Sequence, residues 1–443
     1  MTTLGACEPT TPDARSADRP NVLIIVTDDQ PLGTMSAMPE TARLLGDEGT
    51  RFVNAFAATP NCCPSRASIM TGQYAHNHGV TENSKALRLV QDNTLQRHLH
   101  DAGYFNATVG KFLNRWPIDQ APPYFDRWTT FSSTSNNAHY YSGGRWNVDG
   151  TVERIDEYAT SFVERKTLEY LEAAADSNQP WFMYVAPTAP HSDLQQLARV
   201  ETSHQEDPVE RWHPEPSVGE GNRGDKPKFV RALDFEDDRG ERSREAQLRS
   251  LMSVDELVAG VFERLNELGQ ERNTLVIYLS DNGYMWGQHG IVTKHFPYSE
   301  SVRIPLFVRW PDQVEAGGVD RRLVSTVDIA PTVMDALGIP FGPGPDGRSL
   351  LDSDSRREAL LLEHWRSRAL SMPRWASVRA HSFQYIEYYR SRAVVGQEYY
   401  DLRSDPFQLR NLLGDDDDSN DPDLGRAIRL LADFRNCSGS SCP

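Results

Sequence analysis

Asn21-Val-Leu-Ile-Ile-Val-Thr27 is a short apolar run rich in β-branched residues, and it leads directly into Asp28-Asp29. Such a run predicts a strand that is buried on both faces, as the strands of parallel sheets are. The segment Thr274-Leu-Val-Ile-Tyr-Leu-Ser280 repeats the pattern and is followed by Asp281-Asn282-Gly283. Both strands would therefore deliver acidic residues at their carboxyl ends, the edge where open parallel sheets bind ligands.

Strand and helix patterns alternate in the chain between these two segments. Further strands are expected at two places and amphipathic helices at three, namely Phe105–Val109, Trp181–Ala186, Thr94–Ala102, Tyr158–Ala175 and Glu245–Leu268. This alternation predicts an α/β fold with a large, mostly parallel central sheet that has helices on both faces.

The pattern changes after about Leu351. Short strands are expected at four places and a helix after them, at Ala359–His364, Ala376–Ala380, Phe383–Tyr389, Glu398–Leu402 and Gly425–Asn436. Strands in close succession favour an antiparallel sheet. The expected organisation is therefore a disordered tether over residues 1–20, an α/β domain over 21–350 and a smaller domain of antiparallel sheet and helix over 351–443.

Composition and charge exclude some classes of function. The chain has 443 residues, with 46 Lys and Arg against 63 Asp and Glu, so its formal charge is −17. This acidity argues against nucleic-acid binding, which needs a basic surface to neutralise phosphates. An anionic small substrate is still compatible, because salt screens the global charge and the local placement of Arg and Lys decides. The sequence contains no apolar run long enough for a transmembrane helix.

The first residues carry a weak targeting signal. Leu4-Gly5-Ala6-Cys7 resembles a bacterial lipobox, in which the cysteine becomes a lipidated first residue, and the stretch from Glu8 to Pro20 is polar and rich in Pro, Thr and Ser, as a tether is. No apolar signal-peptide core precedes the motif, so a plain disordered N-terminus is the alternative. We expect an exported bacterial protein, either lipid-anchored at Cys7 or secreted.

The acidic residues after the two core strands form a set with oxygen ligands only: Asp28, Asp29, Asp281 and Asn282. Such hard ligands select Ca²⁺ or Mg²⁺ over zinc or copper, and Ca²⁺ is favoured because it accepts adjacent carboxylates in flexible geometry. The structural alternative is that these residues cap turns and helix starts, as Asp and Asn often do.

One motif decides between these interpretations. Cys62-Cys63-Pro64-Ser65-Arg66, with Thr71-Gly72 at the expected spacing, resembles the sulfatase signature C-x-P-S-R followed by T-G. In that family the cysteine is oxidised to formylglycine (3-oxoalanine) by a formylglycine-generating enzyme. The modified residue would be Cys62, because Cys63 has no proline two places further on.

The resemblance to the type I sulfatases, within the alkaline phosphatase superfamily, extends from Asn21 to the C-terminus. Further landmarks occur in the family's order: Gly110-Lys111, Ala189-Pro190-His191-Ser192, Asp281-Asn282-Gly283, Gly287-Gln288-His289-Gly290, Lys294, Tyr400-Asp401-Leu402 and Asp405-Pro406. Three segments resemble the N-acetylglucosamine-6-sulfatase branch in particular: Tyr74-Ala75-His76-Asn77-His78, Gly110-Lys111-Phe112-Leu113-Asn114 and the Cys437–Cys442 pair.

The resemblance implies roles for individual residues. The metal shell would consist of Asp28, Asp29, Asp281, Asn282 and the formylglycine at Cys62. The sulfate and its leaving oxygen would be surrounded by Arg66, Lys111, His191 and Lys294. Each of these four has a structural alternative: the lysines as surface charges, the arginine as an ion-pair partner at a helix start, and the histidine as a hydrogen-bonded loop residue. Three more histidines are candidates for supporting or substrate-contacting groups: His76, His78 and His289.

One position departs from the family. Many arylsulfatases have a histidine two residues after the lysine that corresponds to Lys111, where this chain has Leu113. Asn114 or His78 could take over that contact, so its role is left unassigned. Cys437 and Cys442 are expected to form a disulfide in an exported protein, with two exposed thiols as the alternative, and Cys63 is expected to remain an unpaired core thiol.

The implied activity is release of inorganic sulfate from a sulfated sugar or an aryl sulfate. A hydrated formylglycine would attack sulfur, and its second hydroxyl would later expel the sulfate. The alternatives are a phosphonate or phosphate ester hydrolase of the same superfamily and a catalytically silent protein that binds sulfated glycans.

Overall fold

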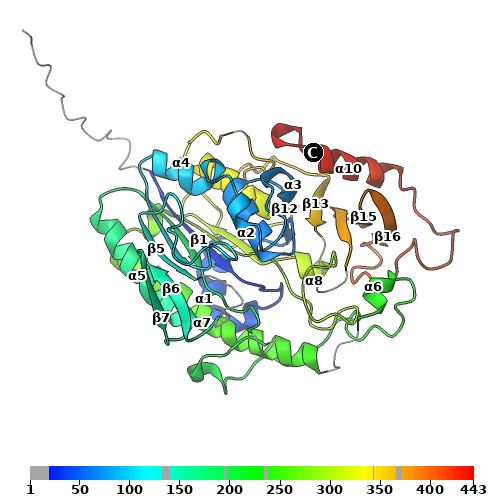
Figure 1. Cartoon of the computed structure of the whole chain (residues 1–443), viewed down its shortest axis with the longest axis horizontal. Helices are drawn as coiled ribbons and strands as arrows, with labels where there is room; N and C mark the ends of the chain where they lie inside the picture. Colours follow the sequence, from blue (N-terminus) through cyan, green and yellow to red (C-terminus); the bar gives the residue numbers. More distant parts are fainter. Residues whose placement is uncertain (1–18, 132–139, 194–196, 234–237, 343, 366–371) are drawn as a thin grey trace, which may run out of the picture.

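A ten-stranded sheet runs through the larger part of the molecule (Figure 1). The computed structural model describes residues 19–131, 140–193, 197–233, 238–342, 344–365 and 372–443. The predicted lipid-anchored Cys7 and nearly all of the predicted tether lie outside the described residues. Among the described residues, no helix is both long and apolar enough to span a membrane.

Five neighbouring strands form the parallel centre of this sheet. In spatial order they are β9 (Thr274–Ser280), β1 (Asn21–Thr27), β8 (Trp181–Ala186), β4 (Phe105–Gly110) and β5 (Arg127–Phe131). Every residue of β1, β8 and β9 is buried. The register pairs Thr27 with Ser280, so the two segments that follow, at 28–29 and 281–282, leave the sheet at the same edge. The prediction from the two apolar runs is confirmed.

Shorter strands complete the sheet on both sides and make it mixed. One side carries β10 (Leu306–Arg309), β2 (Thr50–Phe52) and β11 (Gly318–Asp320), and the other carries β6 (Gly144–Val148) and β7 (Thr151–Ile155). β10 runs antiparallel to β9, and β6 runs antiparallel to both β5 and β7. A separate two-stranded sheet pairs β3 (Ala55–Phe56) with β12 (Val324–Ser325).

Helices cover both faces of the large sheet, as predicted. One face packs against α5 (Ala159–Asp176) and α7 (Arg239–Glu267), with α1 (Pro39–Thr41) beside α7. The other face packs against α2 (Cys62–Thr71), α4 (Leu95–Asp101) and α9 (Ile329–Ala336). Three single-turn helices lie outside these layers: α3 (Ala75–His78), α6 (Lys228–Arg231) and α8 (Ser299–Val302).

A four-stranded antiparallel sheet follows, in the order β13 (Ala359–His364), β14 (Arg374–Ala380), β15 (Phe383–Arg390) and β16 (Ala393–Asp401). The helix α10 (Gly425–Asn436) packs against β13 and β14 and ends beside the Cys437–Cys442 disulfide. The predicted elements and the predicted disulfide are confirmed, and Cys63 is buried and unpaired. The strand predicted at Glu398–Leu402 spans Ala393–Asp401. The prediction missed its first residues because they are exposed and carry no burial pattern.

Candidate active site

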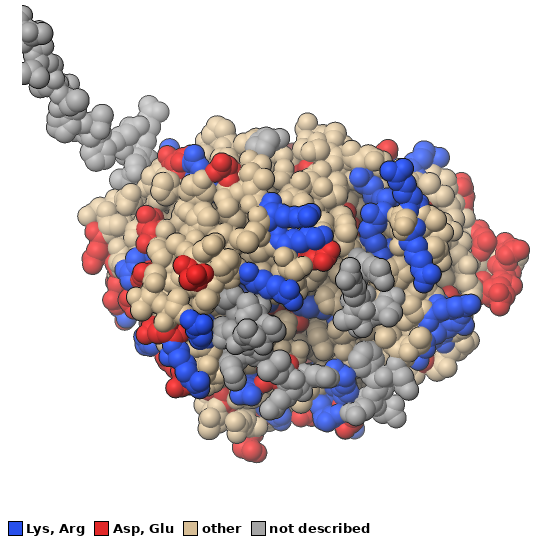
Figure 2. Space-filling view, viewed as in Figure 1, with Lys and Arg blue, Asp and Glu red and all other residues tan. Residues whose placement is uncertain are grey.

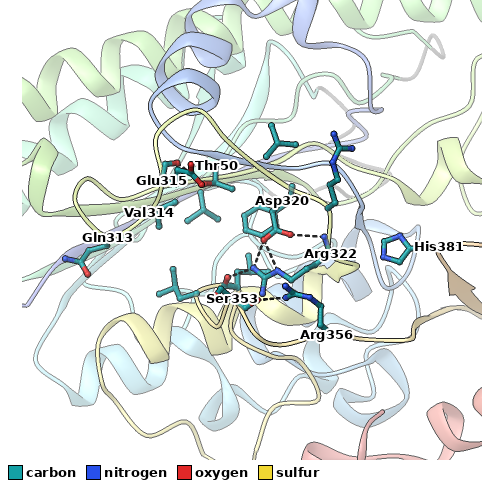
Figure 3. Close-up of a pocket in the computed structure, with 15 residues that line it drawn as sticks. Thr50, Gln313, Val314, Glu315, Asp320, Arg322, Ser353, Arg356 and His381 are labelled. Atoms are coloured by element: carbon teal, nitrogen blue, oxygen red, sulfur yellow. Dashed lines mark hydrogen bonds and ion pairs between the residues drawn. The ribbon is translucent and has the colours of Figure 1, made fainter.

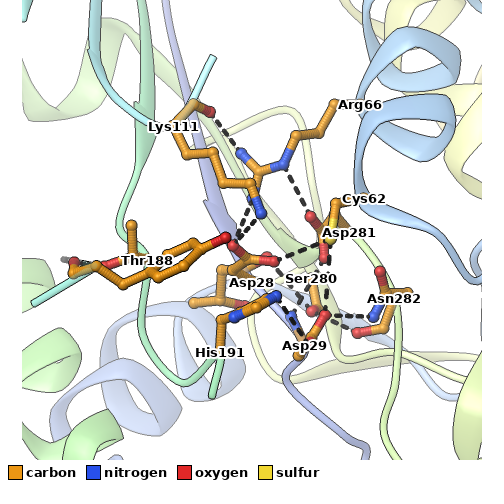
Figure 4. Close-up of polar contacts among 12 residues, drawn as sticks. Asp28, Asp29, Cys62, Arg66, Lys111, Thr188, His191, Ser280, Asp281 and Asn282 are labelled. Carbon is orange, nitrogen blue, oxygen red and sulfur yellow. Dashed lines mark hydrogen bonds and ion pairs between the residues drawn. The ribbon is translucent and has the colours of Figure 1, made fainter. Parts of the chain in front are cut away.

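Cys62 is the first residue of α2, and its helix start lies against the carboxyl edge of β1 and β9 (Figure 4). The side chain has no exposed surface. Its Sγ lies 3.4 Å from Asp28 Oδ1 and 3.9 Å from Asp29 Oδ1. The structure therefore brings together the cysteine of the signature motif and the acidic pair after the first strand, as predicted.

Asp281 and Asn282 reach the same place from the end of β9. The backbone amide of Asp29 donates to Asp281 Oδ1 at 3.2 Å, and Asn282 Nδ2 donates to Asp29 Oδ1 at 2.7 Å. Asp29 has a positive φ of 67°, a conformation that L-residues adopt only when their surroundings hold it. All four predicted oxygen ligands thus converge on one fully buried cluster.

Three cations surround this cluster. Lys294 Nζ donates to Cys62 Sγ at 2.7 Å and also contacts Asp29 Oδ1. Lys111 Nζ donates to Asp28 Oδ2. Arg66 is fully buried on the first turns of α2, where Nε donates to Asp281 Oδ2 at 2.8 Å and Nη1 donates to the Lys111 carbonyl at 2.6 Å. The interpretation of the two lysines as surface charges is therefore wrong.

The cluster suits a divalent cation. Its donors are carboxylate and amide oxygens, the set that Ca²⁺ and Mg²⁺ prefer. The ammonium group of Lys294 already lies among Asp29, Cys62 and Asn282, the last at 3.5 Å from its Nζ. Three of the predicted metal ligands therefore already contact a positively charged group in this structure. The metal-binding atoms of Asp28, Asp29, Cys62 and His191 all lie within 4.8 Å of one another.

His191 enters the site on the loop after β8. Its Nδ1 lies 2.5 Å from the Ser192 carbonyl, so this nitrogen carries the proton and Nε2 faces Asp29 Oδ2 at 3.7 Å. The ring stacks on Tyr140 with 5.0 Å between centroids, and Tyr141 donates to the His191 carbonyl. Burial lowers the pKa of His191, so the imidazole is neutral and accepts at Nε2.

Burial and close charges shift the other ionisable groups in opposite directions. Burial alone would raise the pKa of Asp28, but Lys111, His191, Arg66 and Lys294 together hold it well below the usual range. Burial and the neighbouring Asp28 raise the pKa of Asp281 to about 6. Burial and Asp28 also raise the pKa of the Cys62 thiol, which therefore stays protonated at neutral pH. An unmodified Cys62 is thus a poor nucleophile, since the thiolate is the reactive form.

The three additional histidines have other partners. His76 Nδ1 lies 3.0 Å from Glu363 Oε1, and its Nε2 lies 3.2 Å from the Cys437 carbonyl, to which Asn77 also donates. These bonds join α3 to the C-terminal disulfide.

His78 uses both ring nitrogens, on Ser68 Oγ and on the Val80 amide, and is therefore not free to take over a substrate contact. His289 pairs with Glu220 at 2.7 Å. Leu113 lies in the apolar core.

Two residues at the site carried no sequence signal. Tyr140 supplies the stacking surface for His191. Gln247, in the middle of α7, donates from Nε2 to the carbonyls of Pro190 at 3.3 Å and Asp29 at 3.5 Å. This amide therefore fixes the two loops that carry His191 and the acidic pair. A glutamine at one position of a long amphipathic helix has no pattern that marks such a role.

An open cavity of about 600 Å³ lies elsewhere, against β2 and β11 (Figure 3). Its central Arg322 pairs with Asp320 and donates to the carbonyls of Leu350 and Asp352, so its guanidinium is committed to the fold. The described residues of this cavity include no cluster of metal-ligating groups. The buried cluster around Cys62 remains the candidate active site.

Two family profiles match the chain. The sulfatase profile covers residues 20–339, and the profile described as N-sulphoglucosamine sulphohydrolase, C-terminal, covers 287–422.

Curated relatives include the putative extracellular sulfatase Sulf-1 homolog of Caenorhabditis elegans, 32% identical over 81% of this chain, and the N-acetylglucosamine-6-O-sulfatase of Bacteroides thetaiotaomicron, 26% identical over 91% of it. The chain spans 54% of the first relative and 84% of the second.

A solved structure of BT4656 in complex with its substrate D-glucosamine-2-N,6-O-disulfate has the same fold. Its TM-score is 0.81 at 24% identity, and the match covers 94% of this chain and 97% of that chain. The profile that spans most of the chain, together with the convergence of the signature cysteine with the acidic residues at the sheet edge, leads to one conclusion: this chain belongs to the sulfatase family.

Proposed function

We propose that this chain is a sulfuric ester hydrolase that releases inorganic sulfate from a sulfated sugar. The observation that carries the proposal is that three buried cations, Arg66, Lys111 and Lys294, contact the cluster formed by Cys62 and its neighbouring aspartates, in a protein whose net charge is −17 (Figure 2 shows the charged residues of one face). Local positive charge in an acidic protein suits a small anionic group.

A formylglycine at residue 62 and a divalent cation would complete the site. A formylglycine-generating enzyme would convert Cys62 to the first group. The cation, for which Ca²⁺ is the first choice and Mg²⁺ the second, would be held by Asp28, Asp29, Asp281 and Asn282. Together they supply a nucleophilic oxygen and a Lewis acid.

The chain's own cations would hold the sulfate. Lys111 and Lys294 each extend one ammonium group to the cluster, and an ammonium presents three donors that suit sulfate oxygens. The guanidinium of Arg66 is mostly committed to Asp281 and the Lys111 carbonyl. Its remaining Nη2 lies 3.9 Å from Asp28 Oδ2 without a hydrogen bond among the described residues, so this atom is the one that Arg66 can offer. These donors would stabilise charge that develops on sulfate oxygens in the transition state.

His191 would serve the leaving oxygen. Because the Ser192 carbonyl accepts from Nδ1, only Nε2 faces the site. Nε2 carries no proton in the resting site, so His191 would first take up a proton there, which the negative charge of a bound sulfate ester favours, and would then pass it to the departing alcohol oxygen. Stacking on Tyr140 holds the ring plane for this transfer.

The favoured substrate class is a 6-sulfated N-acetylglucosamine. Its support is the relatedness to enzymes named N-acetylglucosamine-6-sulfatase, including the human one, which is 28% identical over 99% of this chain. Relatives named extracellular sulfatases support export, and a lipid anchor at Cys7 is part of the same proposal.

The test is a comparison of substrates on protein matured in its own host. We expect turnover of 4-nitrophenyl sulfate to exceed that of 4-nitrophenyl phosphate and of a phenyl phosphonate, and 6-O-sulfated N-acetylglucosamine to be preferred over sugars sulfated elsewhere. Higher turnover of the phosphonate would replace the proposal with a phosphonate hydrolase. An intact mass that shows unmodified Cys62 in the native protein would instead indicate a silent glycan-binding protein.

A further inference from the structure

A second cluster of metal-ligating side chains lies away from Cys62, where residues 197–207 meet α5 and α7. Glu201 precedes the single 3₁₀ turn η5 (Thr202–His204), which ends in His204, and Glu256 projects from α7. The ligand atoms of these three residues lie within 4.8 Å of one another. Glu164, on α5, interacts electrostatically with both glutamates.

The histidine has the geometry of an oriented ligand. His204 is only 10% exposed, and its Nδ1 lies 2.8 Å from Asp207 Oδ2. Its Nε2 points to the other side, 3.3 Å from Glu256 Oε2, and makes no aligned hydrogen bond within the described part of the chain. A carboxylate on one ring nitrogen that leaves the other for a cation is the usual arrangement of metal-binding histidines.

The basic group beside these carboxylates is the imidazole of His204. No ion pair or hydrogen bond joins Glu164, Glu201 or Glu256 to a lysine or arginine among the described residues. Instead, the hydroxyls of Ser161 and Ser253 donate to Glu201 at 2.7 and 2.9 Å.

Gly260, one turn after Glu256, allows the close approach of Glu164, because a Cβ there would lie 2.6 Å from Glu164 Oε1. Burial and the two other glutamates raise the pKa of Glu164. The fold thus holds like charges close together, which favours a cation between them.

We propose that Glu201, His204 and Glu256 form a second divalent-metal site, with Asp207 orienting the imidazole. One imidazole nitrogen with carboxylate oxygens suits zinc or a neighbouring transition metal better than calcium. The ion would tie the loop after β8, which carries His191, to α5 and α7. The site is separate from the proposed hydrolase chemistry.

The test uses the full chain, loaded with Ca²⁺ and titrated with ZnCl₂ by calorimetry, with bound metal counted by mass spectrometry after gel filtration. We expect the unaltered chain to bind one more zinc ion than His204→Ala. Glu256→Gln, at a side chain that is 60% exposed and therefore dispensable for folding, should weaken this zinc at least tenfold. Asp207→Asn, which changes only the orientation of the ring, should weaken it by about 10- to 100-fold.

His100→Ala is the matched control, because His100 also lies beside an aspartate, 3.7 Å from Asp101, but on the surface. It should bind zinc as the unaltered chain does. Equal zinc stoichiometry and affinity in the unaltered chain, His204→Ala and Glu256→Gln would overturn the proposal. His204 would then be an imidazolium in an ion pair with Asp207 and Glu256.

Discussion

Position 62 is fully buried, and its side chain contacts a cation and two carboxylates. Cys62→Ser keeps nearly the same volume and a nucleophilic oxygen, but it lacks the second oxygen that would expel sulfate. We therefore expect turnover to stop after at most one event per molecule. Incubation with an aryl sulfate, followed by peptide mass spectrometry, should reveal sulfate on the peptide that contains residue 62.

Cys62→Ala is the control for this experiment and should show neither adduct nor turnover. Sustained multiple turnover by Cys62→Ser would contradict the assignment of residue 62 as the nucleophile.

The oxygen ligands at the sheet edge lead to a second prediction. Asp28, Asp29, Asp281 and Asn282 offer no soft donor, so the metal that supports activity should be removable by a chelator and replaceable by Ca²⁺ or Mg²⁺. Activity should be lost on dialysis against EDTA and regained with either ion, as followed by release of 4-nitrophenol. Recovery with Zn²⁺ alone would refute the ligand assignment, whatever zinc binds elsewhere on the chain.

The sequence predicted those site residues that lie in local motifs. Asp28 and Asp281 follow apolar strands, and Cys62 stands in a signature of fixed spacing, so each carried a local signal. Gln247 and Tyr140 carried none, because their roles depend on which loops the fold places beside them. The partner of His76 was hidden for the same reason, since Glu363 is distant in the chain.

At the scale of the element, α2 depends on the glycine that ends it. Gly72 has a φ of +67°, and a Cβ there would lie 2.8 Å from Pro345 and 2.9 Å from Pro331. Gly72→Ala should therefore combine the cost of a left-handed L-residue, about 1–2 kcal/mol, with an overpacking cost of about 1–3 kcal/mol. Urea unfolding of the two proteins measures the difference.

Gly79→Ala separates these two costs. Gly79 ends α3 with a φ of +76°, but a Cβ there meets nothing within 4 Å. The free energy of unfolding of Gly79→Ala should therefore fall only by the cost of a left-handed L-residue, without an overpacking cost. A loss in Gly79→Ala equal to that in Gly72→Ala would show that α2 does not need close packing at its end.

The elements that the sequence predicted share a strong burial pattern. β1, β8 and β9 are buried throughout, and α10 was predicted with its observed bounds. The edge strands β6, β7 and β11 were not predicted, because they are short and partly exposed and exist through pairing with neighbours. The beginning of α7 at Arg239 was also missed, since its first turns lack an apolar stripe.

For the whole molecule, buried histidines make stability depend on pH. Burial, with a smaller contribution from His76, lowers the pKa of His78 from 6.5 to about 3. Between these two pH values the unfolded chain binds a proton at His78 and the folded chain does not. The contribution of the neutral His78 to the free energy of unfolding is therefore complete above pH 6.5 and declines as the pH falls. From pH 8 to pH 5 this histidine should remove about 2 kcal/mol of unfolding free energy.

The measurement is urea unfolding at pH 8 and pH 5 for the unaltered chain and for His78→Gln. The variant should be less stable at pH 8 but should lose less stability on acidification. His100→Gln, at a half-exposed position, is the control and should keep the full pH dependence. An unchanged pH dependence in His78→Gln would show that folding does not lower the pKa of His78.

The hydrogen bonds from His76 and Asn77 to the Cys437 carbonyl also determine when this part of the protein can finish folding during synthesis. The turn directly after α2 is braced by Cys437, 361 residues further along the chain than His76, so this brace forms only after the chain as far as Cys437 has emerged from the ribosome. Cys62, by contrast, is made early and has no exposed surface once folded. If Cys62 is converted to formylglycine as proposed, the modifying enzyme has a limited interval in which to act, and a chain that folds fast would carry more unconverted cysteine than one that folds slowly.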